Sequence, residues 1–462
     1  MNRAELTALY LAEVKRRGAR AGELLGKLPE SELLNSFFRG RYLSRPLFIG
    51  HQERDRLYAD LEAVRAALAS LPDRLFAGDL EAFARAVGAP DVHVAAILRG
   101  GSAPPSRQAR ADLYADQAGF HLLEFNMGSA LGGMENADMC RALLEHPVLA
   151  EFAESHKLCY VDTMREQVND MFIECGFEPG SFPVVAVTDW PSSYEKKLGA
   201  YMHHLAARWR KLGLDAHACH AGQLEPRHGR VWLDGRAVDI IARMFLIENL
   251  LESPQAPALM NPLLDAVARG EVTMFTPLDS ELLGSKGALA MLSDDRNRHA
   301  FSAAELASID RLLPWTRMIR RAEVRLEDGR VVDLLDYATT HQDELVIKPT
   351  MMTGGQGVLL GWDAGTSAEL WRERLTAAIG GPYVIQRRIA TVPELFPDER
   401  GELVPWTTAW GIFTVVNGYG GVFTRGHPVG SDIAVINVGT GASVGCCLST
   451  VPGGADAADR AK

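Results

Sequence analysis

The segment SFPVVAVTDW at 181–190 constrains the fold most, because it is a short and continuous apolar run. Pro179 and Gly180 mark a turn before it, and such a run is typical of a strand buried on both faces. The helical pattern YEKKLGAYMHHLAARWRKLG follows, and DAHACHAG and RVWLDGRAVDIIARMF supply further short strands. Strand–helix–strand order places helices over a sheet, so the sequence predicts a small α/β domain with a parallel sheet at 179–275.

Two different patterns precede this domain. Residues 1–100 are rich in Ala, Leu, Arg and Glu at helical spacing, which predicts a helical N-terminal region. Residues 101–178 contain two expected strands, near 109–114 and 119–125, that a turn at Asp116–Gly119 joins. The rest of this segment consists of a glycine-rich stretch, Gly128–Gly133, and a helical stretch at 135–176.

Residues 276–450 combine helices with many strands. The expected elements are helices near 285–293, 302–313 and 367–379, a hairpin turning at Asp328–Gly329, strands in DELVIKP and PYVIQRRI, and the β-rich piece WTTAWGIFTVVNGYGGVFTRG. Residues 451–462 are small and polar, and they predict a flexible tail. The whole chain is therefore expected to belong to the α+β or α/β class.

Composition narrows the function. The chain has 462 residues and a net charge of −11, which argues against a nucleic-acid partner, since such proteins usually carry a basic face. Six cysteines occur without a C-x-x-C pair, as expected for a reduced, cytoplasmic protein. The N-terminal MNRAELTALYLAEVKRR is typical of an amphipathic helix and not of a signal peptide, and no apolar run is long enough to span a membrane.

The two strands near 109–125 carry a cluster of polar side chains. Arg110 and Asp112 lie on the first, and Glu124 and Asn126 on or just after the second. Residues two apart point to one face of a strand, so a hairpin gathers all four side chains. Two carboxylates and an amide suit Mg²⁺, and the arginine suits negative charge on a transferred phosphoryl group. A solvated hairpin whose exposed face carries these residues is the alternative interpretation.

A second set of residues suits phosphate binding. Lys348 ends the strand ELVIKP, and the loop Gly354–Gly357 follows six residues later. A lysine at a strand end reaches phosphate oxygens as a point charge, and glycines let backbone N–H groups approach phosphates closely. The loop is neither a Walker loop nor a Rossmann fingerprint. A strand–turn–strand with a solvent-reaching lysine explains the same residues.

Three more residues are candidates for the same nucleotide. Gln386, in PYVIQRRI, is placed to bond the exocyclic amine of adenine, and Glu394, eight residues on, to accept from ribose hydroxyls. Lys286 begins the helix in LLGSKGALAMLSD, after an expected loop. The alternative interpretation is that all three side chains lie at the surface, in contact with solvent.

Together these motifs resemble the ATP-grasp superfamily in its circularly permuted form, as in the glutathionylspermidine-synthase-like proteins. In ordinary members the R-x-D … E-x-N element closes the domain, after the lysine, the glycine loop and the adenine linker. Here R-A-D … E-F-N at 110–126 precedes I-K-P and G-G-Q-G at 347–357. VDIIARMF, LLGSKGALAMLSD and LLPWTRMI are also similar to the permuted family.

The resemblance implies a circularly permuted ATP-grasp fold. Its magnesium-binding hairpin would lie in 101–178, a pre-ATP-grasp α/β domain in 179–275 and the nucleotide-binding region in 276–450, with 1–100 as a helical N-terminal extension. The implied cofactors are ATP and one or two Mg²⁺ ions, with Mn²⁺ as a substitute.

The resemblance also implies a role for each candidate residue. The metal ligands would be Asp112, Glu124 and Asn126, and Arg110 would be catalytic, stabilising the phosphorylated species and the tetrahedral intermediate. The nucleotide would be bound by Lys286, Lys348, Gly354, Gly355, Gln356, Gly357, Gln386 and Glu394. Many family members have Glu in place of Gln386, and either side chain accepts from an amine. Arg243 and Arg425 would bind a carboxylate or phosphate, although surface salt bridges explain them equally well.

The implied activity is an ATP-dependent carboxylate–amine ligase, which forms an amide through an acyl-phosphate. The alternatives are a phosphotransferase without ligation and a non-catalytic nucleotide-binding protein. No carrier or amidase-like domain is visible, so the expected partners are small-molecule acids and amines, amino acids or small peptides. A homodimer, formed through the first 100 residues, is a further arrangement open to the chain.

Overall fold

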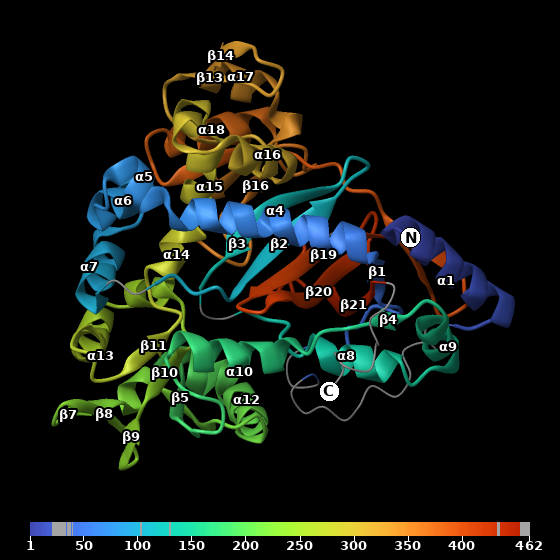
Figure 1. The fold of residues 1–462 in the computed structure, drawn as a ribbon. Helices are drawn as coiled ribbons and strands as arrows, with labels where there is room; N and C mark the ends of the chain where they lie inside the picture. Colours follow the sequence, from blue (N-terminus) through green and yellow to red (C-terminus); the bar gives the residue numbers. More distant parts are fainter. Residues whose placement is uncertain are drawn as a thin grey trace.

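A computed structural model describes residues 1–20, 34, 38, 40–101, 104–128, 131–431 and 435–452 (Figure 1). Part of the expected helical N-terminal region, two residues of the glycine-rich stretch Gly128–Gly133 and most of the expected tail at 451–462 lie outside the described residues.

A central sheet joins segments from the two ends of the chain. In the part of the chain that the structure describes, this sheet has eight strands, with the main order β1-β21-β20-β19-β2-β3. The strands of the main order are β1 (Leu47–Ile49), β21 (Ser443–Thr450), β20 (Gly418–Pro428), β19 (Leu403–Val415), β2 (Ala109–Ala115) and β3 (Phe120–Asn126). Two further strands pair at its flanks, β18 (Glu394–Pro397) with β19 and β4 (Leu158–Cys159) with β21. The expected hairpin at 109–125 is therefore confirmed, and it pairs antiparallel with a strand almost 300 residues later.

Helices bury both faces of the central sheet, because neighbouring residues of each strand point to opposite faces. Ile412 and Val422 pack in one core with α4 (His51–Ala69), which crosses the sheet in Figure 1. Phe413 and Phe423 pack in a second core with α8 (Asn136–Leu143) and α10 (Thr163–Glu174). This explains why β19 is continuously buried from Thr408 to Val415, and β20 from Gly420 to His427.

The predicted α/β domain is built on a parallel sheet. Within the described residues 179–275 the strand order is β11-β10-β5-β6, and every pair is parallel, as expected. These strands are β5 (Val184–Asp189), β6 (Asp215–His220), β10 (Ile240–Arg243) and β11 (Thr273–Phe275). Helix α12 (Gly199–Lys211) packs against β5 and β6. A small antiparallel sheet, β7 (Glu225–Arg227), β8 (Arg230–Leu233) and β9 (Arg236–Val238), projects from this domain (Figure 1). Helix α13 (Ala256–Ala268) contacts the strands β7 and β8.

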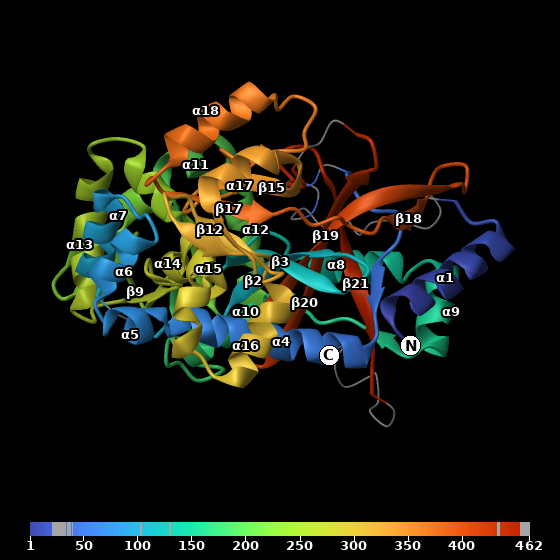
Figure 2. The same ribbon diagram turned by 90° about the horizontal axis from the view of Figure 1, so that it is seen from above.

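Residues 314–387 form a third unit with its own core. Its antiparallel sheet has the order β12-β17-β15-β16, from β12 (Thr316–Met318), β15 (Leu345–Pro349), β16 (Leu359–Leu360) and β17 (Tyr383–Arg387). The sheet packs against α17 (Leu334–Thr340) and α18 (Ala368–Ala378), with β13 (Glu323–Arg325) and β14 (Val331–Asp333) forming the expected hairpin. Figure 2 shows this unit beside the central sheet; α15 (Lys286–Ser293) contacts both β12 and α4, and α16 (Ala303–Leu312) packs on α4.

The first 100 residues are not only helical, as the sequence pattern had predicted. Besides α1 (Arg3–Arg17), α4, α5 (Leu71–Phe76), α6 (Leu80–Ala86) and α7 (Asp91–Gly100), they contribute β1, which pairs in parallel with β21 at the edge of the central sheet. The run Leu47–Ile49 is too short to show a period, but all three side chains are buried. Among the residues with described positions, no helix has the length and apolarity that a membrane crossing requires.

Burial of His93 makes stability depend on pH. Its ring is 1 % exposed, neither ring nitrogen has a hydrogen-bond partner among the described residues, and burial lowers its pKa to about 4. In the unfolded chain this imidazole binds a proton near pH 6.5, whereas in the folded chain it stays neutral until the pH is near 4. The free energy of unfolding therefore falls as the pH drops from 6.5 to 4. We expect a loss of about 3 kcal/mol over this window in urea unfolding.

The variant His93→Leu has no imidazole at this position and should lack this pH-dependent loss of stability. The difference between the unfolding free energies of the variant and the parent should therefore change by about 3 kcal/mol between pH 6.5 and pH 4. His299→Leu, at an exposed histidine, is the matched control and should follow the parent. Parallel curves for the parent and His93→Leu would show that His93 does not titrate in this way.

Candidate active site

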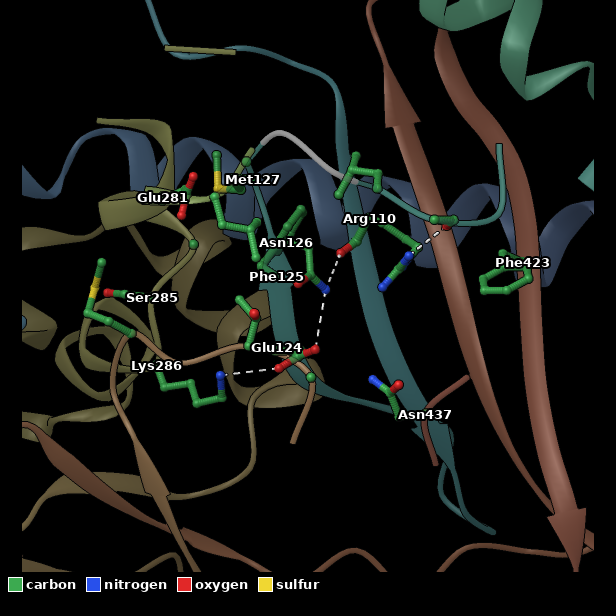
Figure 3. A pocket seen from close by; sticks show the side chains of 18 of the residues that line it. Arg110, Glu124, Phe125, Asn126, Met127, Glu281, Ser285, Lys286, Phe423 and Asn437 are labelled. Carbon is green, nitrogen blue, oxygen red and sulfur yellow. Dashed lines mark hydrogen bonds and ion pairs between the residues drawn. The ribbon is translucent and has the colours of Figure 1, made fainter. Parts of the chain in front are cut away.

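The hairpin β2–β3 gathers the four polar residues that the sequence singled out. Arg110 faces Asn126 across the hairpin and Asp112 faces Glu124, so all four side chains share one face. Asn126 Nδ2 lies 3.2 Å from Asp112 Oδ2 and 3.4 Å from Glu124 Oε1. Figure 3 shows Arg110, Glu124 and Asn126 around one cavity, as the two-residue spacing predicted.

Asp112 lies between two guanidinium groups. Arg110 donates to both of its carboxylate oxygens at 2.9 and 3.1 Å, and Arg425 Nη2 lies 2.6 Å from Oδ1. Burial alone raises the pKa of Asp112, but the charges of Arg110 and Arg425 outweigh it and hold the pKa well below its usual range. Arg110 also donates to the Gly132 carbonyl at 2.6 Å, so this guanidinium is fixed from two sides (Figure 3).

Lys286 reaches the same cluster from another domain. It is the first residue of α15, where the Ser285 side chain caps the helix by accepting from Ala288 N at 3.1 Å. Its ammonium group lies 3.2 Å from Glu124 Oε2 and donates to the Met352 carbonyl at 3.0 Å. Lys286 is therefore buried and paired, and not the solvated first-turn lysine that the sequence left open.

Lys348 and Gln386 meet on the face of the third unit's sheet that points away from the core of that unit. The Lys348 ammonium group donates to Gln386 Oε1 at 2.6 Å, and the structure thus brings together two residues that the sequence had assigned separate roles. Burial, together with the nearby charge of Lys286, lowers the pKa of Lys348 to about 8. A lysine of this kind is available as a cation at neutral pH without a carboxylate partner of its own.

The glycine loop curves back because three of its residues have left-handed backbones. Gly354, Gly355 and Gly357 have φ angles of 65°, 80° and 69°, which other residue types rarely adopt. Just before it, Thr353 N donates to Glu248 Oε1 at 2.9 Å, a contact from the α/β domain. The loop is thus anchored at its start, while Gln356 at its tip is exposed.

Two cavities meet at this charged cluster. One, of about 260 Å³, is lined by Arg110, Asn126, Ser285, Glu281 and Phe423 among others, and the second, of about 120 Å³, by Lys348, Gln386, Val346, Leu360, Trp362 and Ile436 among others. Their walls have four residues in common, Glu124, Lys286, Arg425 and Asn437. A ligand in one cavity therefore lies next to a ligand in the other, with carboxylate and cationic groups at the junction.

Four predicted residues lie outside the lining of both cavities, namely Glu394, Arg243 and two residues of the glycine loop, Gln356 and Gly357. Glu394 is held in an ion pair with the buried Arg45 at 2.6 Å, which directs its carboxylate away from Gln386 and Lys348. Arg243 has a fully buried side chain that donates to the Thr276 carbonyl at 2.7 Å and ion-pairs with Glu281. The ion pair of Arg243 is buried, and not at the surface as the alternative interpretation had it. Its partner Glu281 lines the larger cavity. Arg425, in contrast, lines both cavities.

Sequence reasoning missed three residues of this region. A Cβ on Gly411 would lie 2.9 Å from Arg110 Cδ, so only glycine lets the arginine cross strand β19. A glycine inside an apolar strand is itself a signal of such close approach. Glu248, which anchors the loop, and Asn437, which lines both cavities, lie in segments with no pattern that could have singled them out.

Comparison with known proteins adds the fold. No protein-family model matches the chain, and no curated protein matches its sequence. The chain is similar to the structure of a glutathione synthetase-like effector from Globodera pallida, with 10% identity, a TM-score of 0.53 and coverage of 88% of this chain and 89% of that chain. A protein described as a gamma-glutamylcysteine synthetase from Methylobacillus flagellatus has 15% identity, a TM-score of 0.44 and coverage of 87% and 89%. The first similarity shows that the chain shares the fold of a synthetase-like protein.

Asp112 is expected to be the counter-charge on which the hairpin depends. Asp112→Asn leaves the buried Arg110 and Arg425 facing each other without a carboxylate, so the free energy of unfolding should fall by about 3–5 kcal/mol in urea titrations. Glu124→Gln breaks a more exposed ion pair with Lys286 and should cost about 1 kcal/mol. Equal losses of unfolding free energy in the two variants would contradict the role of Asp112 as the counter-charge of Arg110 and Arg425.

Proposed function

We propose that this protein is an ATP-dependent carboxylate–amine ligase with a circularly permuted ATP-grasp fold, forming an amide through an acyl-phosphate. The observation that carries the proposal is the junction of the two cavities at Glu124, Lys286 and Arg425. A ligase of this kind needs a nucleotide and an acceptor side by side, with cations and carboxylates where the phosphoryl group passes between them.

The smaller cavity suits the nucleotide. Val346, Leu360 and Ile436 supply apolar walls for a base, and Lys348 lies within the same cavity. The glycine loop borders this cavity through Gly355, and Lys286 lies at its junction with the larger one. In this arrangement the base lies near Gln386, the loop covers the triphosphate, and the two lysines contact its oxygens.

The hairpin residues fit a hard divalent cation such as Mg²⁺. The proposed donors are two carboxylates and one amide, a set that leaves room for phosphate oxygens. Among the described residues no group of three or more His, Cys, Asp and Glu suits a metal ion. Asp112 already accepts from two arginines, so Glu124 and Asn126 have the larger unused acceptor capacity. The ion would supply neutralisation of phosphate charge.

The larger cavity suits the acid and the amine. The acid's carboxylate oxygen attacks the γ-phosphorus of ATP, the bond from that phosphorus to the β,γ-bridging oxygen breaks, and ADP leaves. The amine nitrogen then attacks the acyl carbon, the carbon–oxygen bond to phosphate breaks, and inorganic phosphate leaves. Arg110 and Arg425 are placed to offset the negative charge of both transition states.

The second cavity favours an enzyme over a non-catalytic nucleotide-binding protein, which has no use for a cluster in which Arg110, Asp112, Glu124 and Asn126 are held on one face. A ligase and a phosphotransferase both need an acceptor cavity beside the nucleotide, and the fold shared with a synthetase-like protein supports the ligase. The apolar walls that Phe423 and Leu131 add to the larger cavity suit an organic substrate and not water alone.

ADP release should therefore require two co-substrates. In a screen of amino acids and small peptides against amines, we expect ADP and free phosphate only when an acid and an amine are present together with ATP and Mg²⁺. Glu124→Ala should lower turnover at least a hundredfold, because it removes an oxygen donor at the point of phosphoryl transfer.

Exposed Glu145→Ala is the matched control and should keep full turnover. A stable phosphorylated acid without an amine would instead indicate a phosphotransferase. Unchanged turnover in Glu124→Ala would remove the role given to the hairpin.

Lys348 should make ATP binding depend on pH. Because its pKa is about 8, the free protein loses this cation above that pH and must take up a proton to bind a phosphate group. We expect the affinity for ATP to be constant below about pH 7.5 and to fall up to tenfold per pH unit above about pH 8. Titration calorimetry of the parent and of Lys348→Arg, whose charge persists, gives the comparison; a pH-dependent Lys348→Arg would assign the effect to another group.

A further inference from the structure

Gln386 belongs to a row of side chains on one face of the third sheet. Thr316 on β12 and Val346 on β15 lie directly opposite Gln386 on β17, and Lys348 lies two residues beyond Val346. Directly opposite residues share a face of a sheet, and a residue two positions on is their diagonal neighbour. Gln386 is thus flanked by a hydroxyl on one side and by an ammonium group on the other.

The hydrogen bonds along this row fix the direction of the Gln386 amide. Lys348 can only donate, so the atom that faces it at 2.6 Å must be the carbonyl oxygen Oε1. The Thr316 hydroxyl donates to the Pro314 carbonyl at 2.8 Å, so it accepts from Gln386 Nε2 at 3.0 Å. Both neighbours therefore require the same orientation, and a turned amide would set NH₂ against an ammonium group.

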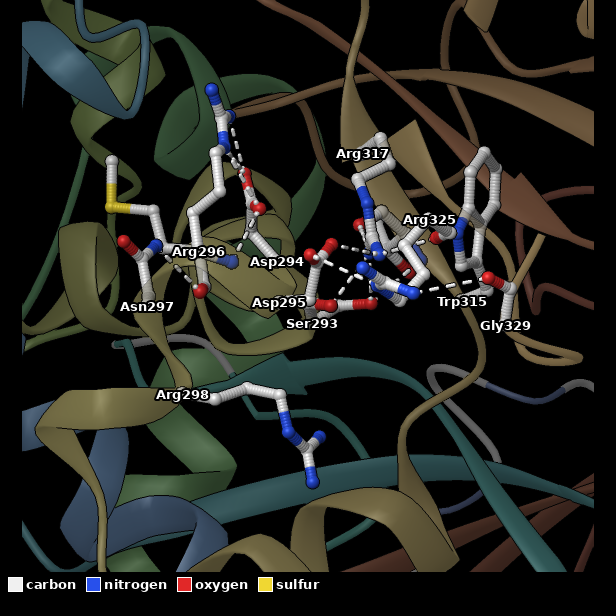
Figure 4. Close-up of polar contacts among 12 residues, drawn as sticks. Ser293, Asp294, Asp295, Arg296, Asn297, Arg298, Trp315, Arg317, Arg325 and Gly329 are labelled. Atoms are coloured by element: carbon white, nitrogen blue, oxygen red, sulfur yellow. Dashed lines mark hydrogen bonds and ion pairs between the residues drawn. The ribbon is translucent and has the colours of Figure 1, made fainter. Parts of the chain in front are cut away.

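Thr316 is itself held rigidly. Its backbone N donates to Ser293 Oγ at 2.9 Å, and it is fully buried. The next residue, Arg317, donates to Ser293 O at 2.6 Å and to Arg325 O at 3.0 Å, which ties strand β12 to the end of helix α15 (Figure 4). The hydroxyl therefore has a defined position relative to Gln386.

We propose that Thr316 is a positioning residue for nucleotide selection, because it locks Gln386 so that the cavity presents a hydrogen-bond acceptor to the edge of the base. This rests on the proposed nucleotide site. An acceptor pairs with the exocyclic amine of adenine and opposes the carbonyl oxygen at the same position of guanine. The locked glutamine offers the same acceptor that a glutamate offers.

The lock matters most when a nucleotide is bound. Phosphate oxygens draw the Lys348 ammonium group away from Gln386 Oε1, and the Thr316 hydroxyl then remains as the one described contact that holds the amide. Without that hydroxyl the amide is free to turn and to donate to guanine. Selectivity for adenine thus depends on a residue that does not itself line the cavity.

The test measures dissociation constants of the full-length protein for the β,γ-imido analogues of ATP and GTP with Mg²⁺. Thr316→Val keeps the side-chain shape but removes the hydroxyl, and it should reduce the preference for the ATP analogue about tenfold, the value of one buried hydrogen bond. Thr316→Ser keeps the hydroxyl and should keep the preference.

A double variant separates selection from a merely structural role. A carboxylate has no donor in either orientation, so Thr316→Val combined with Gln386→Glu should regain the preference for the ATP analogue. Gln386→Glu alone should keep the preference and Gln386→Met should lose it, which tests the acceptor even if Thr316→Val does not fold.

The inference is overturned if Thr316→Val leaves the ratio of the two dissociation constants unchanged. It is also overturned if Thr316→Val loses the preference for the ATP analogue and the double variant does not regain it. In both cases the proposed binding of ATP remains valid. Retention of the preference in Gln386→Met overturns the inference as well. A parent protein that binds neither analogue overturns the proposed nucleotide site, and this inference with it.

Discussion

The antiparallel pairing of β2 with β19 is the interaction on which the rest of the site depends. It places Asp112 opposite Gly411, and β20, the next strand along, brings Arg425 to the same carboxylate. Cores on both faces bury this pairing, so its register cannot slip without turning every apolar side chain to the wrong side. The arrangement of the four polar side chains is therefore set by sheet packing and not by the hairpin alone.

Sequence reasoning succeeded where a period or a local motif was present. The two-residue spacing of Glu124 and Asn126 predicts a strand with both side chains on one face, and the structure has it. The apolar run before Asp189 predicts a strand buried on both faces, and the structure has this strand too. Sequence reasoning did not predict the ion pair of Glu394 with Arg45 or that of Arg243 with Glu281, because a contact with a distant residue leaves no local pattern. Short strands such as β1 were missed because three residues show no period.

Several side chains at the two cavities carry a charge opposite in sign to the net charge of the chain. The chain carries a net charge of −11, yet Arg110, Arg425, Lys286 and Lys348 all line the two cavities. Each is held in the interior by a specific acceptor, a carboxylate for three of them and the amide of Gln386 for Lys348. The net negative charge of the chain thus coexists with these four cationic side chains at the walls of the two cavities.

The order of the central sheet has a consequence for how the chain folds. Both borders of its main path, β1 and the β2–β3 hairpin, come from the first 126 residues, whereas the three middle strands come last in the chain. During synthesis β1 emerges before its partner β21, and the β2–β3 hairpin leaves one edge of β2 unpaired until β19 leaves the ribosome. The central sheet is thus completed late, because it pairs residues that lie far apart in the sequence. Until then the unpaired edges of the early strands are open to association with other chains.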